Sequence, residues 1–408
     1  MFDYLLVGGG LQNGLIALAL LSSRPGARVA LVERGHSIGG NHLWSFHAGD
    51  VPDDARALVD PLVAHRWPGY DVIFPGSRRA LDEAYAAIPS SRLDAAVRDR
   101  LGSAPGCALF LGTSVTEVAP HRVTLADGRR LEAHLVIDAR GPSALPADLA
   151  AGYQKFLGLE LRVDPGTCPH RAVLMDASVP QRDGLRFFYV LPLSADRVLV
   201  EETYFSDTPC FDPEQVRPSV LTYALERGLT PLEIVREETG VLPLPWRLQP
   251  PPPTPGLLIA GYQGGWFHPT TGYSLPCALR LARVVASHSP SDLPTSAELE
   301  ALCAARDEQL SFCLLLNRAL FTAFAPEARV HAMERFYESP SATIRRFYAM
   351  TFTLADRLRL VWGRPPRGLS LRRAFEIYRH ADGRAQASTP FLGTDHSSVP
   401  CVPHPRKR

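Results

Sequence analysis

The sequence predicts an α/β fold that combines a nucleotide-binding domain, a second, antiparallel sheet and a helical C-terminal part. At the N-terminus a buried strand, a glycine turn and a helix follow one another within the first 21 residues. Short apolar segments separated by prolines and Asp-Gly turns fill the middle of the chain. Beyond residue 275, apolar residues recur at spacings of three and four, the period of an amphipathic helix. Together these patterns indicate an α/β chain of more than one domain.

The composition is that of a large globular protein. Hydrophobic residues make up 46% of the 408-residue chain, which excludes disorder as the main state and allows one large or two to three smaller domains. The 37 prolines and 31 glycines follow no period, so a fibrous structure is excluded as well. No basic leader and no apolar stretch of about 18 residues is present, and we expect a protein that is neither secreted nor membrane-spanning.

The seven cysteines are scattered along the chain and include no Cys-x-x-Cys pair. Their odd number and wide spacing favour reduced structural thiols in a cytosolic protein. His42, His47 and His268 also lack the spacing of metal ligands, so we expect no metal site. We interpret these histidines as hydrogen-bonding residues near a nucleotide site, with a plain structural role as the alternative.

The net charge of +1 hides two regions of opposite charge. Residues 340–408 contain 13 basic and 4 acidic side chains, a net charge of +9, which leaves −8 for residues 1–339. The chain therefore consists of an acidic body and a basic C-terminal region. The acidic body argues against a nucleic-acid partner, which would select a basic domain.

The opening βαβ unit is followed by a hairpin, a second sheet, a return strand and helices. The expected elements are strands at 4–7 and 29–32 around a helix at 11–21, a hairpin-like stretch at 115–138 with its turn at Asp127-Gly128, a mostly antiparallel sheet over about 153–245, a stiff proline connector at 250–253, a buried strand at 257–260, and helices over 303–324 and 336–362. We divide the chain into a discontinuous nucleotide-binding domain (1–75, 105–150 and 251–290), a substrate domain (76–104 and 151–250) and a helical C-terminal region (291–408) that is basic beyond residue 340.

The glycine turn after the first strand is the strongest sign of nucleotide binding. Gly8 and Gly10 allow the backbone to turn tightly and approach a pyrophosphate at the N-terminus of the following helix, where free N–H groups favour negative charge. The third glycine of the usual fingerprint is displaced, because Asn13 occupies its place and Gly14 comes next. Glu33, 19 residues after Gly14 at the end of the second strand, is the candidate to bind ribose hydroxyls. An ordinary glycine turn with an exposed glutamate is the alternative.

Three further segments favour FAD over NAD as the nucleotide. Gly39-Gly40 resembles the glycine doublet that many FAD proteins have after the ribose carboxylate, and residues 138–141 resemble the segment that closes the first nucleotide half. Residues 261–272 resemble the late flavin segment, although Tyr262 replaces its usual Asp. We therefore predict a Rossmann-type FAD-binding domain. The cofactor-binding residues that we predict are Gly8, Gly10, Asn13, Gly14, Glu33, Gly39, Gly40, Asp138, Gly141, Gly261, Pro269 and Gly272.

Six segments of the chain share their pattern with one family. They are residues 6–15, 39–47, 186–193, 200–203, 238–243 and 264–274. In this combination the chain resembles the bacterial lycopene β-cyclases of carotenoid biosynthesis, in which Asn13 is an expected residue. The family's Phe-Leu-Glu-Glu-Thr box reads Leu199-Val200-Glu201-Glu202-Thr203 here, so both carboxylates and the threonine are kept.

The resemblance implies a fold like that of flavin hydroxylases and an isomerase reaction. The acyclic ends of lycopene would become β-ionone rings, giving β-carotene via γ-carotene. Protonation of the terminal double bond, capture of the tertiary cation by the neighbouring alkene and loss of a ring proton leave substrate and product isomeric. FAD would undergo no net redox change and would act in its reduced form, with NAD(P)H or another donor as the electron source. An FAD-dependent isoprenoid reductase or monooxygenase, or a flavin-binding protein without catalysis, are the alternatives, because a fold does not fix the chemistry.

The chemistry that the resemblance implies needs a carboxylic acid that stays protonated near neutral pH. Burial beside a second carboxylate raises the pKa of one member of such a pair. Glu201-Glu202 supplies two carboxylates, but adjacent residues of a strand face opposite sides, so only one can face the substrate. The resemblance favours Glu201 as the catalytic acid, with Glu202 as its support. Two solvent-facing carboxylates are the alternative, which the apolar run at 198–200 disfavours.

The resemblance also places aromatic side chains along the substrate. A cationic polyene needs walls that stabilise charge without adding to it as nucleophiles, a role suited to aromatic faces. Our candidates for the substrate pocket are Phe187, Tyr189, Trp266, Phe267 and His268, with Phe188 and Tyr204 as further aromatic candidates. A position in the protein core is the alternative for each of them.

Lycopene is insoluble in water, so an enzyme of this kind must collect its carotenoid substrate from a membrane. In the basic region, arginines alternate with apolar residues: Arg345, Arg346, Arg357, Arg359, Arg372 and Arg373 with Phe347, Leu354, Leu358, Leu360 and Trp362. This pattern favours a cytoplasmic protein in peripheral contact with anionic lipid. A solvated helical face is the alternative, and the sequence makes no prediction of the oligomeric state.

Overall fold

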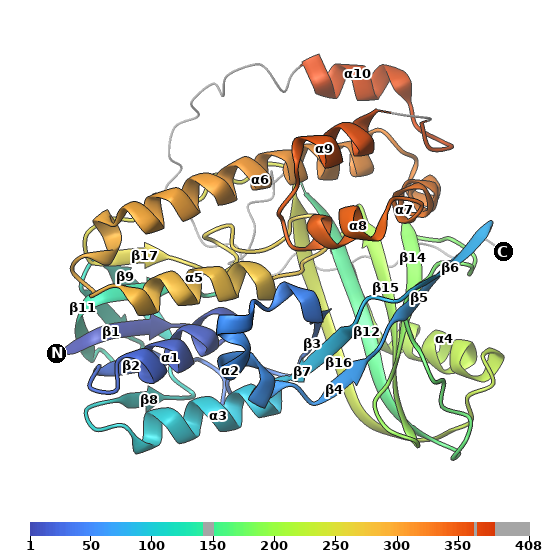
Figure 1. Ribbon diagram of the computed structural model, residues 1–408. Helices are drawn as coiled ribbons and strands as arrows, with labels where there is room; N and C mark the ends of the chain where they lie inside the picture. Colours follow the sequence, from blue (N-terminus) through green and yellow to red (C-terminus); the bar gives the residue numbers. More distant parts are fainter. Residues whose placement is uncertain (142–150, 363–364, 380–408) are drawn as a thin grey trace.

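The computed structural model describes residues 1–141, 151–362 and 365–379 of the 408-residue chain. Figure 1 shows two lobes side by side, each built on one large sheet, with the C-terminal helices crossing above both of them. The predicted fold class, an α/β protein with a nucleotide-binding lobe, a second antiparallel sheet and a helical C-terminal part, is confirmed.

The first lobe is built on a seven-stranded sheet in the order β8-β2-β1-β11-β10-β9, with β17 paired to β11. Its strands are β1 (Phe2–Val7), β2 (Val29–Val32), β8 (Ala108–Phe110), β9 (Val115–Ala119), β10 (Arg122–Leu125), β11 (Arg130–Asp138) and β17 (Leu257–Ile259). The pairs β1–β2, β1–β11, β2–β8 and β11–β17 are parallel, whereas β9, β10 and β11 form the antiparallel hairpins predicted for residues 115–138.

Side chains of the first sheet alternate between two hydrophobic layers. Leu6 and Leu31 face the layer that contains helix α1 (Leu11–Ser23), which packs between α3 (Ser90–Ser103) and α5 (Leu275–Ser287). Leu5 and Val7 face the opposite layer, which is closed by residues of the β9–β10 hairpin. Strands buried on both faces are typical of parallel sheets, and this burial fixes the end of β1 and the glycine turn that follows it.

The second lobe is a seven-stranded sheet in the order β16-β12-β15-β14-β13-β5-β6. Its strands are β5 (Tyr70–Phe74), β6 (Ser77–Leu81), β12 (Ala151–Val163), β13 (Ala172–Asp176), β14 (Leu185–Pro192), β15 (Arg197–Ser206) and β16 (Pro231–Pro245). All neighbouring pairs are antiparallel except β13–β5. Helix α4 (Pro213–Glu226) covers one face through a separate apolar cluster, which leaves the other face of β12, β14 and β15 turned toward the first lobe.

The chain crosses between the lobes more often than the expected domain boundaries allow. β5, which we placed in the first domain, pairs with β13 of the second sheet. Helix α3, which we placed in the second domain, packs on α1 through an apolar face that contains Leu93. A small sheet of β3 (Leu43–His47), β7 (Tyr85–Pro89) and β4 (His65–Trp67) lies along the same stretch, together with α2 (Arg56–Val59). The division into domains itself stays a prediction.

The C-terminal part is helical as expected, but it is more broken than the sequence pattern indicates. Its helices are α6 (Ala297–Thr322), α7 (Arg329–Tyr337), α8 (Ser341–Tyr348), α9 (Leu354–Val361) and α10 (Leu371–Arg379). The expected helix over 336–362 is interrupted at Pro340, which cannot continue α7, and at Met350, whose φ of 52° is left-handed. Short 3-10 helices are η1 (Ala48–Asp50), η2 (Asp53–Ala55), η3 (Asp60–Leu62), η4 (Leu293–Thr295) and η5 (Pro326–Ala328).

The cysteines differ in state. Cys107, Cys168, Cys277, Cys303 and Cys313 are free thiols, as expected. Cys210 is disulfide-bonded, so the expectation of reduced thiols is wrong for this residue, and Cys401 lies outside the described residues. Within the described ranges, none of the helices is both long enough and apolar enough to cross a membrane.

Candidate active site

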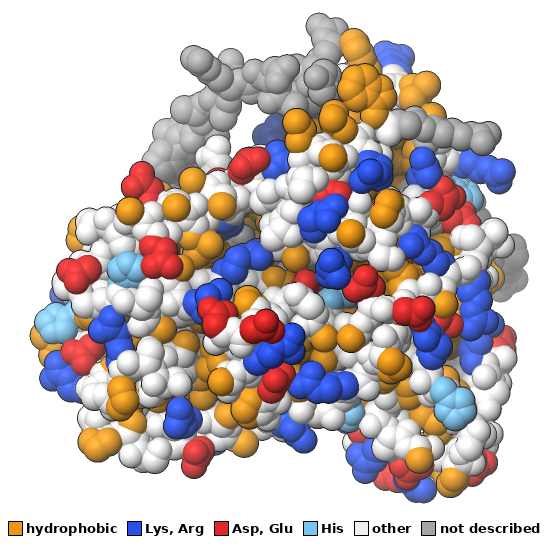
Figure 2. All heavy atoms as spheres, viewed as in Figure 1, with side chains coloured by type: hydrophobic (Ala, Val, Ile, Leu, Met, Phe, Trp, Pro, Cys, Tyr) orange, Lys and Arg blue, Asp and Glu red, His pale blue; other side chains and the backbone are white. Residues whose placement is uncertain are grey.

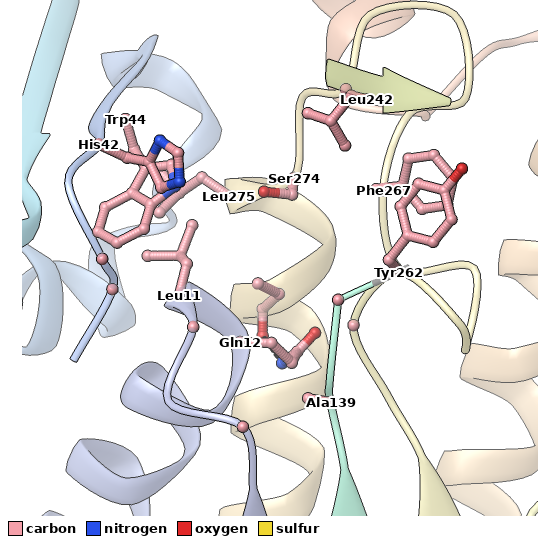
Figure 3. Close-up of a pocket in the computed structure, with 18 of the residues that line it drawn as sticks. Leu11, Gln12, His42, Trp44, Ala139, Leu242, Tyr262, Phe267, Ser274 and Leu275 are labelled. Atoms are coloured by element: carbon pink, nitrogen blue, oxygen red, sulfur yellow. Dashed lines mark hydrogen bonds between the residues drawn. The ribbon is translucent and has the colours of Figure 1, made fainter. Parts of the chain in front are cut away.

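A cavity of about 890 Å³ lies between the lobes and extends from the glycine turn after β1 to the face of the second sheet. Figure 3 shows part of its wall, with Leu11 and Gln12 from the start of α1 on one side and Tyr262 and Phe267 on the other. The cavity therefore joins the expected nucleotide site and the expected acid in one space.

The glycine turn requires glycine for steric reasons. Gly8 has a φ of +91°, and a Cβ added there would lie 3.0 Å from the carbonyl oxygen of Ala139. Asn13 is buried below the turn, and its side-chain amide donates to the carbonyl oxygens of Val7 and Gly8, both at 2.9 Å. The asparagine thus braces the end of β1 and does not itself line the cavity. Gly14 does not line the cavity either. A Cβ added there would meet the side chain of Leu93 of α3.

Glu33 lies at the end of β2 and lines the cavity, as expected for a ribose-binding carboxylate. Its two carboxylate oxygens accept hydrogen bonds from the backbone N–H groups of Gly9, at 2.6 Å, and Gly35, at 2.7 Å. Gly10 precedes α1 as its N-cap, and no acidic side chain occupies the first turn of this helix. The helix N-terminus that faces the cavity is therefore free to bind an anion.

The other predicted cofactor residues fall into two groups. Gly39, Gly40, Gly141, Gly261 and Gly272 line the same cavity as Gly8, Gly10 and Glu33. Asp138 and Pro269 do not line it. The Asp138 carboxylate instead binds the guanidinium of Arg140 at 2.7 Å, and this arginine does line the cavity. The position of Tyr262 is fixed by a hydrogen bond from its hydroxyl to the carbonyl oxygen of Pro243 at 2.8 Å.

The wall of the cavity fits a flavin nucleotide. Gly10 and Gly141 would have nothing within 4 Å of an added Cβ, so the backbone is open there to a ligand. Three buried polar atoms of cavity-lining side chains have no hydrogen-bond partner among the residues that the structure describes, namely Gln12 Oε1, Gln154 Oε1 and Trp266 Nε1. A bound ligand with polar groups along its length would satisfy such atoms, whereas an apolar ligand would leave them unpaired.

The acid end of the cavity contains a pair of carboxylates from two strands. Glu201 of β15 and Glu238 of β16 both line the cavity. Burial, and then the negative charge of Glu238, raise the pKa of Glu201 to about 8. Glu201 accepts a hydrogen bond from the Thr203 hydroxyl at 2.7 Å, and Glu238 forms an ion pair with Arg236 at 2.7 Å. Burial and the neighbouring carboxylate thus favour the protonated form of Glu201, whereas the Glu238 carboxylate is paired with a cation.

Glu202 does not take part in this pair. It lies on the opposite face of β15, is fully buried and forms an ion pair with Arg186 at 2.5 Å. The strand alternation that separates Glu201 from Glu202 was expected, but the partner of Glu201 was not. Glu238 stands in one of the six family-like segments, but only the pairing of β12 with both β15 and β16 places it beside Glu201.

The expected aromatic wall is present only in part. Tyr189, Trp266 and Phe267 line the cavity, whereas Phe187 is buried behind Tyr189 with ring centroids 5.2 Å apart. His268 is also buried outside the cavity, where its ring packs on Phe347, and burial lowers its pKa to about 3, so the ring is neutral. Phe188 and Tyr204 do not line the cavity either. Lining residues that the sequence did not single out for this end are Tyr85, Phe156, Leu174, Leu191, Leu199, Leu242 and Tyr348.

Comparison with known proteins identifies the family. The family model described as "Lycopene cyclase protein" matches residues 3–374. The chain is 42% identical to a lycopene beta-cyclase of Pseudescherichia vulneris, over 90% of this chain and 95% of that protein, and 39% identical to one of Pantoea ananas, with the same coverage of both chains.

Solved structures share the fold at low sequence identity. A probable FAD-dependent monooxygenase, pqsL of Pseudomonas aeruginosa, superposes with a TM-score of 0.56 at 16% identity, covering 88% of this chain and 98% of that one. A geranylgeranyl bacteriochlorophyll reductase-like protein of Thermoplasma acidophilum gives 0.58 at 13% identity, covering 93% and 99%. The fold is thus shared with an FAD-dependent enzyme, and the match to the family model over most of its length shows that the chain belongs to the lycopene cyclase family.

Proposed function

We propose that this protein is a lycopene β-cyclase that converts the acyclic ends of lycopene to β-ionone rings, giving β-carotene via γ-carotene. The observation that carries this proposal is the pair of carboxylates, Glu201 and Glu238, in the cavity that also contains the glycine turn and Glu33. Family membership supports the same reaction.

The proposed cofactor is FAD. The residues that would hold it are the cavity-lining glycines 8, 10, 39, 40, 141, 261 and 272, together with Glu33 for the ribose and the N-terminus of α1 for the pyrophosphate. Bound in its reduced form, the flavin would supply an electron-rich ring beside the cationic intermediate, with NAD(P)H as the proposed source of its electrons. The shared fold of FAD-dependent enzymes supports this choice.

In the proposed reaction the Glu201 carboxyl gives its proton to the terminal double bond of lycopene. The neighbouring alkene captures the tertiary cation and closes the ring, and a ring carbon then loses a proton to a carboxylate of the pair. Proton gain and loss cancel, so substrate and product are isomers and no net redox change occurs. Aromatic faces of Tyr85, Phe156 and Tyr189 line the same region and can stabilise the cation without adding to it.

We further propose that the protein works in the cytoplasm as a peripheral membrane protein and collects lycopene from the bilayer. Apolar side chains are exposed on α9 and α10, among them Trp362 at 78% and Leu354 at 73%. The other exposed apolar residues of this surface are Leu358, Val361, Leu371 and Phe375. Figure 2 shows hydrophobic side chains gathered over these helices beside basic ones. Tyr348, at the end of the preceding helix α8, lines the cavity, so this surface lies one helix away from the cavity wall.

The arginines contribute less free charge to this surface than the sequence pattern suggests. Arg346 and Arg359 both pair with Asp356, Arg345 pairs with Glu83, and Arg357 pairs with Glu308. The proposed contact therefore depends on the exposed apolar residues first and on lipid charge second. Part of the basic region, residues 380–408, lies outside the described residues.

Product mass from lycopene-accumulating cells tests the proposed reaction. A cyclase leaves the mass of lycopene unchanged and shifts the pigment from red toward orange-yellow. A mass gain of two hydrogens would indicate an isoprenoid reductase instead, and a gain of one oxygen would indicate a monooxygenase. Unchanged lycopene with flavin bound and fully reduced would favour a flavin protein without catalysis on this substrate.

A further inference from the structure

The two carboxylates of the cavity come from strands that are not neighbours. Gly158 of β12 pairs with Glu201 of β15 on one side and with Glu238 of β16 on the other. Directly opposite residues of antiparallel strands project from the same face, so all three positions point toward the cavity. Neighbouring strands lie about 4.8 Å apart, which puts the backbones of Glu201 and Glu238 roughly 10 Å apart. Two long side chains can meet over that distance only if nothing stands between them.

Gly158 leaves the space that the pair needs. A Cβ added at this residue would lie 3.0 Å from Cγ of Glu238 and 3.3 Å from Oε2 of Glu201. Both glutamate side chains therefore lean over the middle strand from opposite sides. Any larger residue at this position would separate them, and glycine in a strand interior commonly marks such a close approach.

The partners of the two carboxylates differ, and this difference decides which of them carries the negative charge. Glu238 Oε2 accepts from the Arg236 guanidinium at 2.7 Å and from the backbone N–H of Leu43 at 3.2 Å. Glu201 Oε1 accepts from the Thr203 hydroxyl at 2.7 Å, and within the described part of the chain no cation forms an ion pair with its carboxylate. An adjacent cation and a backbone donor stabilise an ionised carboxylate, so the charge belongs on Glu238 and the proton on Glu201.

The other titratable groups around Glu201 are neutral at pH 7. From β14, β7 and α8 these are Tyr189, Tyr85 and Tyr348, and burial raises the pKa of each tyrosine further above neutrality. His42, from the segment before β3, lies near Glu238, and burial lowers the pKa of its ring. The charges that act on Glu201 from the elements around it are therefore those of Glu238 and Arg236.

We propose that Glu238 is a positioning residue for the acid: reaching Glu201 across Gly158 and held ionised by Arg236, it keeps the proton on Glu201. This inference rests on the proposed function, because it assigns a partner to the acid of that reaction. Without the Glu238 charge, Glu201 would lose its proton at a lower pH and would act as an acid over a narrower range. Removal of Arg236 would raise the pKa of the pair as a whole, because its positive charge lowers the pKa of Glu201 and stabilises ionised Glu238, and the shared proton could then lie on either carboxylate.

The pH dependence of cyclisation by the flavin-loaded, reduced holoenzyme tests this proposal. For the wild type we expect a rate that falls as the pH rises through the pKa of the acid. In Glu238→Gln this falling limb of the pH–rate profile should move to lower pH by about 1 pH unit or more. In Arg236→Gln the falling limb should move to higher pH. A purely structural defect would lower the rate at every pH and leave the limb in place.

The Gly158→Ala variant is a second, independent test that keeps both carboxylates. The added methyl group should push them apart, so the falling limb should move in the same direction as in Glu238→Gln. Gly102→Ala in α3 is the matched control, because an added Cβ there meets nothing within 4 Å, and its profile should coincide with that of the wild type. If Glu238→Gln does not fold, Gly158→Ala and Arg236→Gln decide the question.

The two possible failures are distinguishable. A wild type that forms rings, with a limb that stays in place in Glu238→Gln, or in both Gly158→Ala and Arg236→Gln, would overturn this inference and leave the proposed function intact. A wild type that forms no ring with reduced flavin bound would overturn the proposed function.

Discussion

Glu202 and Arg186 form a buried ion pair, with the carboxylate oxygen and Nε 2.5 Å apart, on the face of β15 that is turned away from the cavity. The carboxylate also accepts a hydrogen bond from the Tyr204 hydroxyl and lies 3.3 Å from the guanidinium of Arg182. One strand thus has two adjacent carboxylates in opposite environments. Glu201 faces the cavity and has no ion pair with any of the described residues, while Glu202 forms ion pairs with two arginines.

Removal of Glu202 should therefore affect stability. Glu202→Ala leaves Arg186 buried without its partner, and breaking a buried ion pair in this way costs about 3–5 kcal/mol of unfolding free energy. Chemical denaturation of the purified protein measures this loss. Glu201→Gln is the matched control on the same strand, and it should unfold at least as late as the wild type. Equal stability of Glu202→Ala and the wild type would contradict a structural role for the ion pair.

Glu201→Gln should abolish cyclisation and leave flavin binding unchanged. The amide keeps the size of the side chain and the contact with Thr203, but it cannot give a proton to an alkene. Turnover of lycopene and the flavin absorbance of the purified variant measure the two properties separately. Turnover at the wild-type rate would mean that another group delivers the proton.

The unfolding free energy should depend on pH through Glu201. Its pKa is raised to about 8 in the folded protein, so between the ordinary glutamate pKa and pH 8 the unfolded chain releases a proton that the folded one keeps. The folded state then binds more protons, and its stability falls as the pH rises through this window. Below this pH window Glu201 is protonated in both the folded and the unfolded state, so it no longer lowers the unfolding free energy. Glu201→Gln removes this cost, so its advantage in melting temperature over the wild type should grow from pH 5 to pH 8. A constant difference would show that the pKa of Glu201 is not raised.

Asn13 should be essential for the glycine turn. Its amide donates to the carbonyl oxygens of Val7 and Gly8, so Asn13→Ala loses one buried and one partly buried hydrogen bond, a cost of about 1–3 kcal/mol. Asn13→Asp has the same shape but places an acceptor against the two carbonyl oxygens and should be the less stable variant. Thermal unfolding and the flavin content after purification measure both effects. Asn13→Asp with normal stability and flavin content would contradict this role.

The proposed membrane surface should depend on its exposed apolar residues. Replacing Leu354 and Trp362 together by serine removes the most exposed of them, and co-flotation with liposomes of anionic lipid should fall several-fold. Leu225→Ser on α4 is the control, because this residue is also exposed but lies on a helix that Figure 1 shows at the other end of the molecule. Charge reversal of Arg372 and Arg373 separates the electrostatic part. Unchanged co-flotation of all of these variants would contradict the proposed membrane surface.

Local patterns were sufficient to predict the nucleotide lobe. A strand, a turn that needs glycine and a helix are contiguous in the sequence, and Glu33 follows at the end of the next strand, so Gly8, Gly10 and Glu33 lie together on the cavity wall. Asn13 and Gly14 follow the same turn but lie below it. Asn13 donates a hydrogen bond to the backbone, and Gly14 contacts α3.

The partner of the acid could not be predicted from local patterns. Glu238 lies 37 residues beyond Glu201, and only the pairing of β12 with both β15 and β16 brings them to one level of the sheet. Glu202, the neighbour in sequence, projects from the opposite face of β15 because side chains alternate along a strand, and it does not line the cavity. Similarly, Phe187 and Tyr189 share a face of β14, yet Phe187 packs on Phe205 and does not line the cavity.

We expect this protein to cyclise lycopene by proton transfer without net oxidation or reduction. The most direct measurement is the mass and absorption spectrum of the carotenoid after incubation of the purified, flavin-reduced protein with lycopene in liposomes. We expect products of unchanged mass whose spectra are those of γ-carotene and then β-carotene, and no products with Glu201→Gln. A product that has gained hydrogen or oxygen, or rings formed equally well by Glu201→Gln, would contradict this expectation.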